Sequence, residues 1–362
     1  MGDKSKIEWT EATWNPVVGC AKVSEGCRNC YAMRVAHRLA GMGQERYKGL
    51  TVRRSSGVEW NGKVRTVPEA LEIPLRWKRP RRIFVNSMGD LFHPSVPEEF
   101  IARIFTVMAL AKHHTFQILT KHPDLMLQWM KDHTSISGKM IGYIEQVNGK
   151  NKELISVEGI PLPLPNVWLG VSVEDQKSAD ERIPILLQVP AAVRWLSMEP
   201  LLGPVDLTPI APPAYQLLSK YYEGNTFDPS GSQKPLERMT GYFPKINWIV
   251  VGGESGSKAR PMHPDWVRSL RDQCTAVSVP FFFKQWGEWK PIHHTDDPDW
   301  CTDIEGDLAI MDAKGYRWED EQFQPTIDVM HTCWELQKLG KKASGRILDG
   351  RTWDEMPKVK EN

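Results

Sequence analysis

The sequence lacks the features that define several large protein classes. No apolar run approaches the roughly 18 residues that span a membrane, and the start, Met1 to Lys6, has no apolar signal-peptide core. Position 6 is Lys rather than Ser or Thr, which excludes the myristoylation motif. Nucleophile-elbow, Walker and zinc-protease signatures are also absent. We therefore expect a cytoplasmic protein that does not contact membranes and uses none of these chemistries.

Cysteine is scarce, with six in 362 residues, and three of the six are scattered at Cys274, Cys301 and Cys333. Such scattered residues do not indicate a disulfide framework. They fit a reducing compartment, in which iron-sulfur clusters survive.

The other three cysteines, Cys20, Cys27 and Cys30, form a C-x6-C-x2-C motif. Three thiolates so close together indicate a metal site. A structural zinc site normally closes with four ligands, whereas a cluster that must bind a substrate keeps one position open. Three cysteine ligands therefore favour a reactive metal cluster with an open position over a structural zinc site.

The residues after the motif predict a helix from Tyr31 to Ala40, with Gly41 as its end. Cys27 and Cys30 would lie at its first turn, where the positive end of the helix dipole lowers a thiol pKa. Two alternatives remain open at this point. One is a zinc knuckle completed by His37, and the other is three unrelated thiols.

A near-zero net charge of +1 hides a strong asymmetry along the chain. Residues 34–82 carry 13 Lys and Arg against 4 Asp and Glu, and residues 291–330 carry 2 against 11. The basic block, which begins just after the cysteines, is a candidate nucleic-acid contact beside the reactive centre. The alternative is two solvated faces.

From Arg82 onward, short β-rich apolar runs that end in polar residues alternate with helical stretches. This alternation is typical of parallel βα units, so we expect a partial or complete (β/α) barrel. The second choice is an open doubly wound sheet. A first strand near Lys6 to Trp14 brings the count to six or seven. The later runs are residues 83–85, 116–119, 167–171, 193–196, 246–251 and 280–283.

The predicted barrel domain covers residues 1–290, and residues 291–362 form an acidic C-terminal extension with a helix expected over Trp334 to Leu336. Two segments break the alternation of strands and helices, and we interpret them as insertions on loops. They are residues 131–165 and 205–244. Residues 42–68 are expected to form a long loop over the cysteines. In the connecting segments we expect a short helix over Pro68 to Trp77, a capping box from Ser95 to Glu98, and a helix opened by His263 and Pro264.

Side chains at the carboxyl ends of parallel barrel strands converge on one face, where active sites are built. Six successive predicted strands end in groups that ionise or form hydrogen bonds. Glu199, Glu254 and Lys284 are the candidate catalytic residues among them. Gly252 and Gly253 are candidates for a loop whose backbone approaches a ligand closely.

The cysteine motif, together with several later motifs, resembles the largely phage-encoded three-cysteine-motif family of uncharacterised proteins, over most of residues 7–290. That family is similar to radical S-adenosylmethionine (SAM) enzymes, with spore photoproduct lyase as a distant relative. In those enzymes the first cysteine gap is usually three residues and an aromatic precedes the third cysteine. Here the gap is six and Asn29 holds that position. The matching segments are residues 14–20, 85–92, 119–121, 170–174, 197–202, 252–256 and 283–287.

The radical SAM resemblance implies a 4Fe-4S cluster held by Cys20, Cys27 and Cys30, with SAM on its fourth iron and an electron donor of reductase or flavodoxin type. One electron then cleaves SAM to a 5′-deoxyadenosyl radical. The SAM-binding candidates are Ser87, Met88, Gly89 and Asp90 for the amino group, Ser172 and Glu174 for the ribose or substrate, and Lys121 or Arg260 for the carboxylate.

Three function classes follow. The leading one is a radical SAM iron-sulfur enzyme acting on an unidentified substrate of nucleic-acid or nucleotide type. The second is a non-catalytic zinc or iron-sulfur protein that binds nucleic acid. The third is a two-metal hydrolase using Asp90, Glu174, Glu199 and Glu254, which lacks the expected close Asp and His pairs.

Overall fold

The computed structural model describes residues 4–148, 161–208, 245–294, 307–315, 317 and 333–358. None of the helices in these ranges combines the length and apolar character that crossing a membrane requires. The chain divides into two compact units. The first is Met1–Val171 with Gln188–Trp195, and the second is Ser172–Leu187 with Leu196–Asn362.

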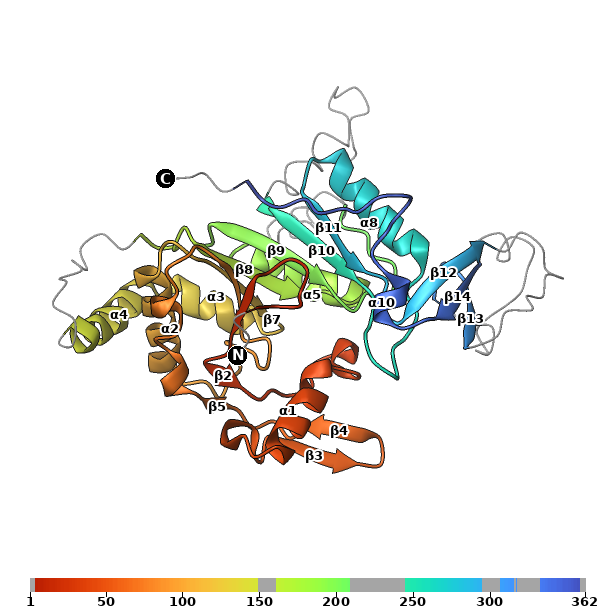
Figure 1. The fold of residues 1–362 in the computed structure, drawn as a ribbon. Coiled ribbons are helices and arrows are strands. Elements are labelled where there is room, and N and C mark those ends of the chain that lie inside the picture. The colour runs from red at the N-terminus through yellow and green to blue at the C-terminus, as the bar shows by residue number, and fades with distance from the viewer. Residues whose placement is uncertain are drawn as a thin grey trace, which may run out of the picture. The chain divides into compact units, whose positions relative to one another are not determined.

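Seven strands form one sheet and follow one another across it in chain order (Figure 1). A doubly wound sheet would reverse this order at a switch point, whereas an unbroken order of parallel strands is that of a (β/α) barrel. Within the described chain the first and last strands do not pair, so the predicted α/β partial barrel is confirmed. In sheet order the strands are β1 (Ala12–Trp14), β6 (Arg82–Val85), β7 (Thr115–Thr120), β8 (Val167–Ser172), β9 (Val193–Met198), β10 (Trp248–Gly252) and β11 (Phe281–Gln285).

Large aromatic side chains fill the core of the first unit. The Trp9 ring packs against Phe84 on β6 and against Trp195 on β9, with ring centroids 4.9 and 5.2 Å apart. Trp195 also donates a hydrogen bond from Nε1 to the carbonyl of Ile118 on β7, at 3.1 Å. Each ring is almost fully buried, so these contacts fix the relative positions of the strands.

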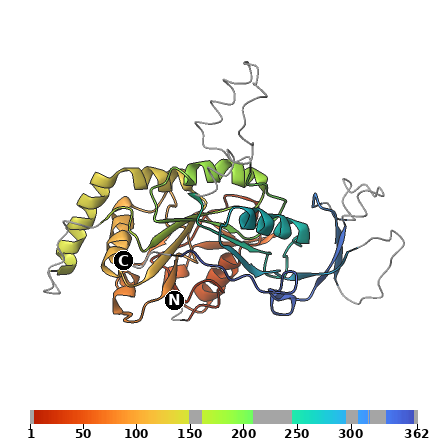
Figure 2. The ribbon, with the colours of Figure 1, turned by 90° about the horizontal axis from the view of Figure 1, so that it is seen from above.

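The helices of the first unit are amphipathic, and α4 lies next to α2 in both views (Figures 1 and 2).

The predicted capping box is wrong, because α2 begins at Glu98 with Pro97 as its N-cap. The predicted helix over residues 68–77 is two separate 3-10 turns. These helices and turns are α1 (Tyr31–Gly41), η2 (Glu45–Tyr47), η3 (Pro68–Ala70), η4 (Pro74–Arg76), α2 (Glu98–Leu110), α3 (Pro123–Lys131) and α4 (His133–Asn148).

The segment expected to be a long loop over the cysteines is instead a small folded region. Strands β3 (Thr51–Arg54) and β4 (Gly57–Trp60) form an antiparallel hairpin, and β5 (Arg65–Thr66) pairs with β2 (Val17–Val18). Trp60 of the hairpin shares a hydrophobic cluster with the buried face of α1. Because this segment is rich in Arg, Gly and Ser, its three short strands are not evident from the sequence.

In the described part of the second unit, the two long helices each begin at a residue whose side chain accepts a backbone hydrogen bond from the first turn. Asp175 forms a capping box with Ser178 at the start of α5 (Gln176–Leu186). His263 accepts a hydrogen bond from the backbone N–H of Asp265 at the start of α8 (Pro264–Ala276), and Pro264 occupies the predicted first turn. The expected insertion over residues 205–244 lies outside the described residues from 209 onward.

The described part of the C-terminal extension contains a three-stranded antiparallel sheet. Its strands are β12 (Trp289–His294), β13 (Leu308–Met311) and β14 (Trp334–Lys338), in the order β12-β14-β13. We expected helix over Trp334–Leu336, but β12 and β13 supply hydrogen-bond partners on both sides, so this segment is a strand. A short helix, α10 (Lys341–Ser344), follows.

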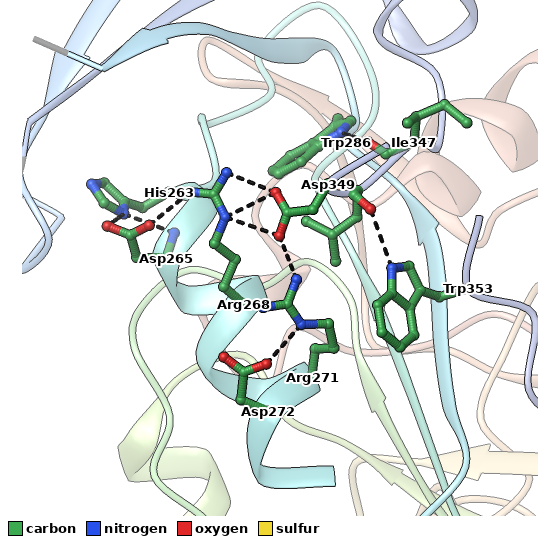
Figure 3. Close-up of polar contacts among 10 residues, drawn as sticks. His263, Asp265, Arg268, Arg271, Asp272, Trp286, Ile347, Asp349 and Trp353 are labelled. Atoms are coloured by element: carbon green, nitrogen blue, oxygen red, sulfur yellow. Dashed lines mark hydrogen bonds and ion pairs between the residues drawn. The ribbon is translucent and has the colours of Figure 1, made fainter. Parts of the chain in front are cut away.

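After α10 the chain forms a strap, residues 346–356, against α8 and the edge of β11. Figure 3 shows Arg268 and Arg271 of α8 converging on the carboxylate of Asp349. Farther along, the backbone N–H of Phe283 donates to the carbonyl of Trp353, at 2.9 Å. The strap therefore covers an edge of β11 that would otherwise expose unpaired backbone groups.

Candidate functional site

The three cysteines lie in one short loop, and all three side chains are half-buried. Cys27 ends the 3-10 turn η1 (Glu25–Cys27), and Cys30 is the N-cap of α1. Cys30 therefore lies at the helix start as predicted, with Cys27 one turn earlier. Gly19, just before Cys20, has a left-handed φ of 92°, and a Cβ there would lie 2.3 Å from the carbonyl oxygen of Lys63.

Three contacts hold this cysteine loop beside the carboxyl end of β6. Gly19 forms a parallel bridge with Gly89, and its N–H donates to the carbonyl of Met88 at 3.0 Å. Tyr31, the first residue of α1, donates from its hydroxyl to the carbonyl of Ser87, also at 3.0 Å. The predicted SAM-binding segment Ser87 to Gly89 therefore lies next to the first cysteine.

Two asparagines that we did not select organise the same region. Asn15, after β1, accepts hydrogen bonds at Oδ1 from the Ser87 hydroxyl and the Met88 N–H, at 3.1 and 3.0 Å. Asn86, with a left-handed φ of 62°, accepts from the N–H of Val17 at 3.1 Å. Their positions directly after strands β1 and β6 are the sequence signal that would have identified them.

The Asp90 carboxylate is buried and accepts three hydrogen bonds. The N–H of Phe92 and the hydroxyl of Thr120 donate to Oδ1, at 3.0 and 2.7 Å, and the N–H of Lys121 donates to Oδ2, at 3.0 Å. These bonds tie the loop after β6 to the loop after β7. Asp90 therefore holds both loops in position.

The Lys121 side chain points toward the cysteine loop, where Nζ donates to the Ser24 hydroxyl at 3.0 Å. The Ser24 oxygen lies 3.9 Å from Sγ of Cys27. Burial works to raise the pKa of the Cys27 thiol. The nearby Lys121 ammonium and hydrogen bonds from Val23 and Ser24 outweigh it, so this pKa is lowered.

The other two thiols are shifted in the opposite direction. Burial raises the pKa of Cys20, and the neighbouring Asp90 carboxylate, Cys30 and Cys27 raise it further. Burial also raises the pKa of Cys30. The charges of Cys30 and Cys27 thus act on Cys20, and the charge of Cys27 acts on Cys30, as expected for cysteines in one short loop.

The part of the chain that the structure describes contains no group of three His, Cys, Asp or Glu side chains arranged to hold a metal ion. His37 contacts the Thr51 hydroxyl through Nδ1, at 3.1 Å. The donor chemistry still suits a thiophilic metal, because three half-buried thiols lie in one loop and the Lys121 ammonium approaches that loop from the end of β7.

The predicted basic block does not form one surface. Arg53 and Arg54 lie on the hairpin that packs against α1, near the cysteine loop. Residues 76–82 precede β6 at its amino end, whereas the cysteine loop lies at its carboxyl end. The four residues of β6 separate the two ends by roughly 10 Å. The second half of the block is therefore not beside the cysteines.

In the second unit, the predicted ligand Glu174 is almost fully buried and paired with Arg182. Nη1 of Arg182 donates to Oε2 of Glu174 at 3.0 Å and to the carbonyl of Ser172 at 2.7 Å. Burial of a carboxylate without such a partner would be costly. The pair therefore fixes the backbone at the carboxyl end of β8.

Glu254 and Arg260, both predicted site residues, are bonded to each other. Arg260 donates from Nη2 to Oε1 at 2.7 Å, from Nε to Oε2 at 2.9 Å, and from its backbone N–H to Oε2 at 2.8 Å. This bidentate geometry closes the loop between the two residues. Gly253, the residue before Glu254, has no space for a side chain, because its Cβ would lie 2.0 Å from the carbonyl oxygen of Trp286.

Glu199 pairs with Lys284 and is the most exposed of the three ion-paired carboxylates among the predicted site residues of this unit. Nζ of Lys284 donates to both carboxylate oxygens, at 2.7 Å each, and the Glu199 side chain remains 21% exposed. Gln285 also approaches Glu199, with Nε2 3.4 Å from Oε1.

A β-bulge explains how two successive side chains of β11 reach the same carboxylate. Val251 pairs with Phe283 and Gly252 with Gln285, so Lys284 is an extra residue opposite β10. Regular alternation would direct Lys284 and Gln285 to opposite faces. A Cβ on Gly252 would contact both of these residues and Glu199 at 3.5 Å, so the glycine lies directly against this polar cluster.

The comparisons with known proteins give a family but no activity. A family model described as "Protein of unknown function (DUF5131)" matches residues 4–357. No curated protein and no solved structure matches the chain. The match covers nearly the whole sequence, so the chain belongs to the DUF5131 family.

Proposed function

We propose that this protein is an iron-sulfur enzyme of radical SAM type, acting on a substrate of nucleic-acid or nucleotide class. The observation that carries the proposal is the attachment of the three-cysteine loop to the carboxyl end of β6 in a parallel partial barrel, through Gly19, Tyr31 and the Ser87 to Gly89 segment. Barrel enzymes build their active sites at this end of the strands.

Cys20, Cys27 and Cys30 would hold three irons of a 4Fe-4S cluster. When bound, the cluster and SAM would supply a 5′-deoxyadenosyl radical that removes a hydrogen atom from the substrate. The Lys121 ammonium would offset the negative charge of the thiolates, because it reaches Ser24 beside Cys27. Ser87 to Gly89 remain candidates for SAM contacts, and Glu199 with Lys284 remain the substrate-side candidates.

A non-catalytic zinc or iron-sulfur protein that binds nucleic acid is the second candidate. Cys20 and Cys30 pack against the same hydrophobic cluster as α1 and the β3-β4 hairpin, so a metal there would also stabilise a small folded region. The two-metal hydrolase is not supported. Each of its four proposed carboxylates already accepts hydrogen bonds from a cation or from several donors.

The test is 5′-deoxyadenosine release from protein reconstituted without oxygen and supplied with reductant and SAM. We expect release by the wild type even without substrate and none by Cys27→Ala, because that variant loses a cluster ligand. Cys301→Ala, which removes a cysteine remote from the motif in the sequence, is the matched control and should behave like the wild type. A well-reduced cluster that neither binds nor cleaves SAM would favour the non-catalytic candidate.

A further inference from the structure

The basic residues at the amino end of β6 and β7 form a surface patch of their own. It consists of Arg76, Lys78, Arg79, Arg81, Lys112 and His113, and is called the amino-end patch below. Two segments distant in sequence build it, because Nε2 of His113 contacts the carbonyl of Trp77 at 2.8 Å. This contact joins the loop before β6 to the loop before β7.

Several of these charges are available to a partner. Lys78, Arg79 and Lys112 are exposed, and no described acidic side chain forms an ion pair with any of them. The acidic neighbours of the segment lie at its two ends, where Glu72 pairs with Arg76 at 3.8 Å and Glu11 with Arg82 at 3.5 Å. The middle of the patch therefore has a positive charge that nothing in the described chain neutralises.

Trp77 gives the patch a rigid centre. The Arg81 guanidinium lies over its ring, 4.8 Å from the centroid, and the ring of His114 meets it edge-on at 6.1 Å. His114 is buried and contacts the carbonyl of Pro74 through Nε2, at 3.1 Å. This stacking holds the Trp77 ring and the Arg81 guanidinium in a defined position beside the exposed residues of the patch.

The surface lacks the apolar side chains that a membrane-binding face would need. The exposed large apolar residues of the described chain are Val23, Tyr31, Met42, Ile141, Leu339 and Ile347, and none lies in the patch. Interfacial membrane surfaces combine basic residues with apolar ones that insert between lipids. Basic residues around an aromatic side chain instead match a surface that follows a phosphate backbone.

We infer that the amino-end patch binds the phosphate backbone of a nucleic acid, at the end of the first unit's strands opposite to the cysteine loop. The inference goes beyond the proposed function, because it requires neither a cluster nor SAM. Binding there would raise the local concentration of the strand around the first unit.

The test measures binding of a fluorescein-labelled DNA oligonucleotide of about 20 nucleotides by fluorescence anisotropy, between about 50 and 200 mM salt. Lys78→Gln with Arg79→Gln should raise the Kd about tenfold at the lowest salt and reduce the slope of log K against log salt by about 1.5. The matched control, Arg53→Gln with Arg54→Gln, removes two charges from the other half of the basic block. It should change the Kd less than about twofold.

The inference is overturned if the control pair weakens binding as much as the patch pair, or if the patch pair binds like the wild type. It is also overturned if the wild type ignores the oligonucleotide but binds phosphatidylserine vesicles through these residues. All four substituted residues are exposed, and circular dichroism verifies the fold of each variant. Iron content and SAM cleavage are measured separately. A negative result in the oligonucleotide assay therefore does not contradict the proposed function, and a protein without a cluster or SAM cleavage does not contradict binding at the amino-end patch.

Discussion

Gly170 shows how a single residue limits the packing of the barrel strands. A Cβ at this position of β8 would lie 2.6 to 2.7 Å from atoms of the Trp195 ring, which is itself fully buried. Trp195 cannot move freely, because its Nε1 is bonded to β7. The glycine is therefore required by close packing.

We expect Gly170→Ala to lower the free energy of unfolding by about 1 to 3 kcal/mol, because the extra methyl forces a buried ring to shift. Thermal unfolding followed by circular dichroism measures the change. Gly142→Ala is the control, since a Cβ on this helical glycine meets nothing within 4 Å. That variant should be neutral or slightly more stable, by up to about 1 kcal/mol.

The three thiols should differ in reactivity when the protein is free of metal. The pKa of Cys27 is lowered from the ordinary value of 9.0, while those of Cys20 and Cys30 are raised. As the pH rises, Cys27 should be the first to become a thiolate, the form that reacts with iodoacetamide. Peptide mass spectrometry after timed alkylation should find Cys27 modified first.

Lys121→Met should slow alkylation of Cys27 and move its pH dependence upward, because the neighbouring ammonium is lost. Lys131→Met removes a lysine from the far end of α3 and should have no such effect. If Cys20 or Cys30 reacts first in the wild type, the placement of Lys121 beside Cys27 is wrong.

At the scale of elements, the bulge in β11 determines where Lys284 and Glu199 meet. Lys284→Met should destabilise the protein by about 2 to 4 kcal/mol, because the mostly buried Glu199 carboxylate loses its cation. Glu199→Gln with Lys284→Met should recover at least about 1 kcal/mol, since it removes the unpaired charge. Denaturant unfolding of the single and double variants measures this coupling, and purely additive losses would show that the pair is unimportant.

The strap over α8 should make stability depend on acid pH. Hydrogen bonds from Arg268, aided by Arg271, lower the pKa of Asp349 below its ordinary 3.8. The unfolded chain then binds a proton more readily than the folded one. The stabilisation is complete above about pH 4 and is lost as the pH falls through the lowered value.

The unfolding temperature of Asp349→Asn should therefore fall less than that of the wild type between about pH 5 and pH 3. Asp272→Asn changes a carboxylate that Arg271 also contacts but that lies outside the strap, and it should follow the wild-type curve. Parallel curves for all three proteins would mean that Asp349 does not couple the strap to α8.

The sequence predicted the sheet strands after β1 well because each contains a β-rich apolar run, as in Val167–Ser172 and Trp248–Gly252. The first strand was predicted near Lys6 to Trp14, but β1 is only Ala12–Trp14. It failed where partners far along the chain decide the conformation. Trp334–Lys338 is a strand only because β12 and β13 lie on either side. The bulge at Lys284 is equally invisible, since it depends on the register against β10.

For the whole molecule, the alternation of apolar runs and helical stretches was enough to predict a parallel α/β fold, and the unbroken strand order distinguishes a barrel from a doubly wound sheet. The cysteine spacing predicted which residues to examine. It could not show that Glu174 and Glu254 have arginine partners, because those pairs depend on loop closure in three dimensions.

The central claim is that Cys20, Cys27 and Cys30 together hold an iron-sulfur cluster beside the carboxyl end of β6. Metal analysis with an absorption spectrum of the wild-type protein, purified without oxygen, tests it most directly. We expect brown protein with about four irons per chain, and a loss of both colour and iron in Cys27→Ala. Colourless, folded wild-type protein that contains one zinc per chain and gains no iron on reconstitution would contradict it.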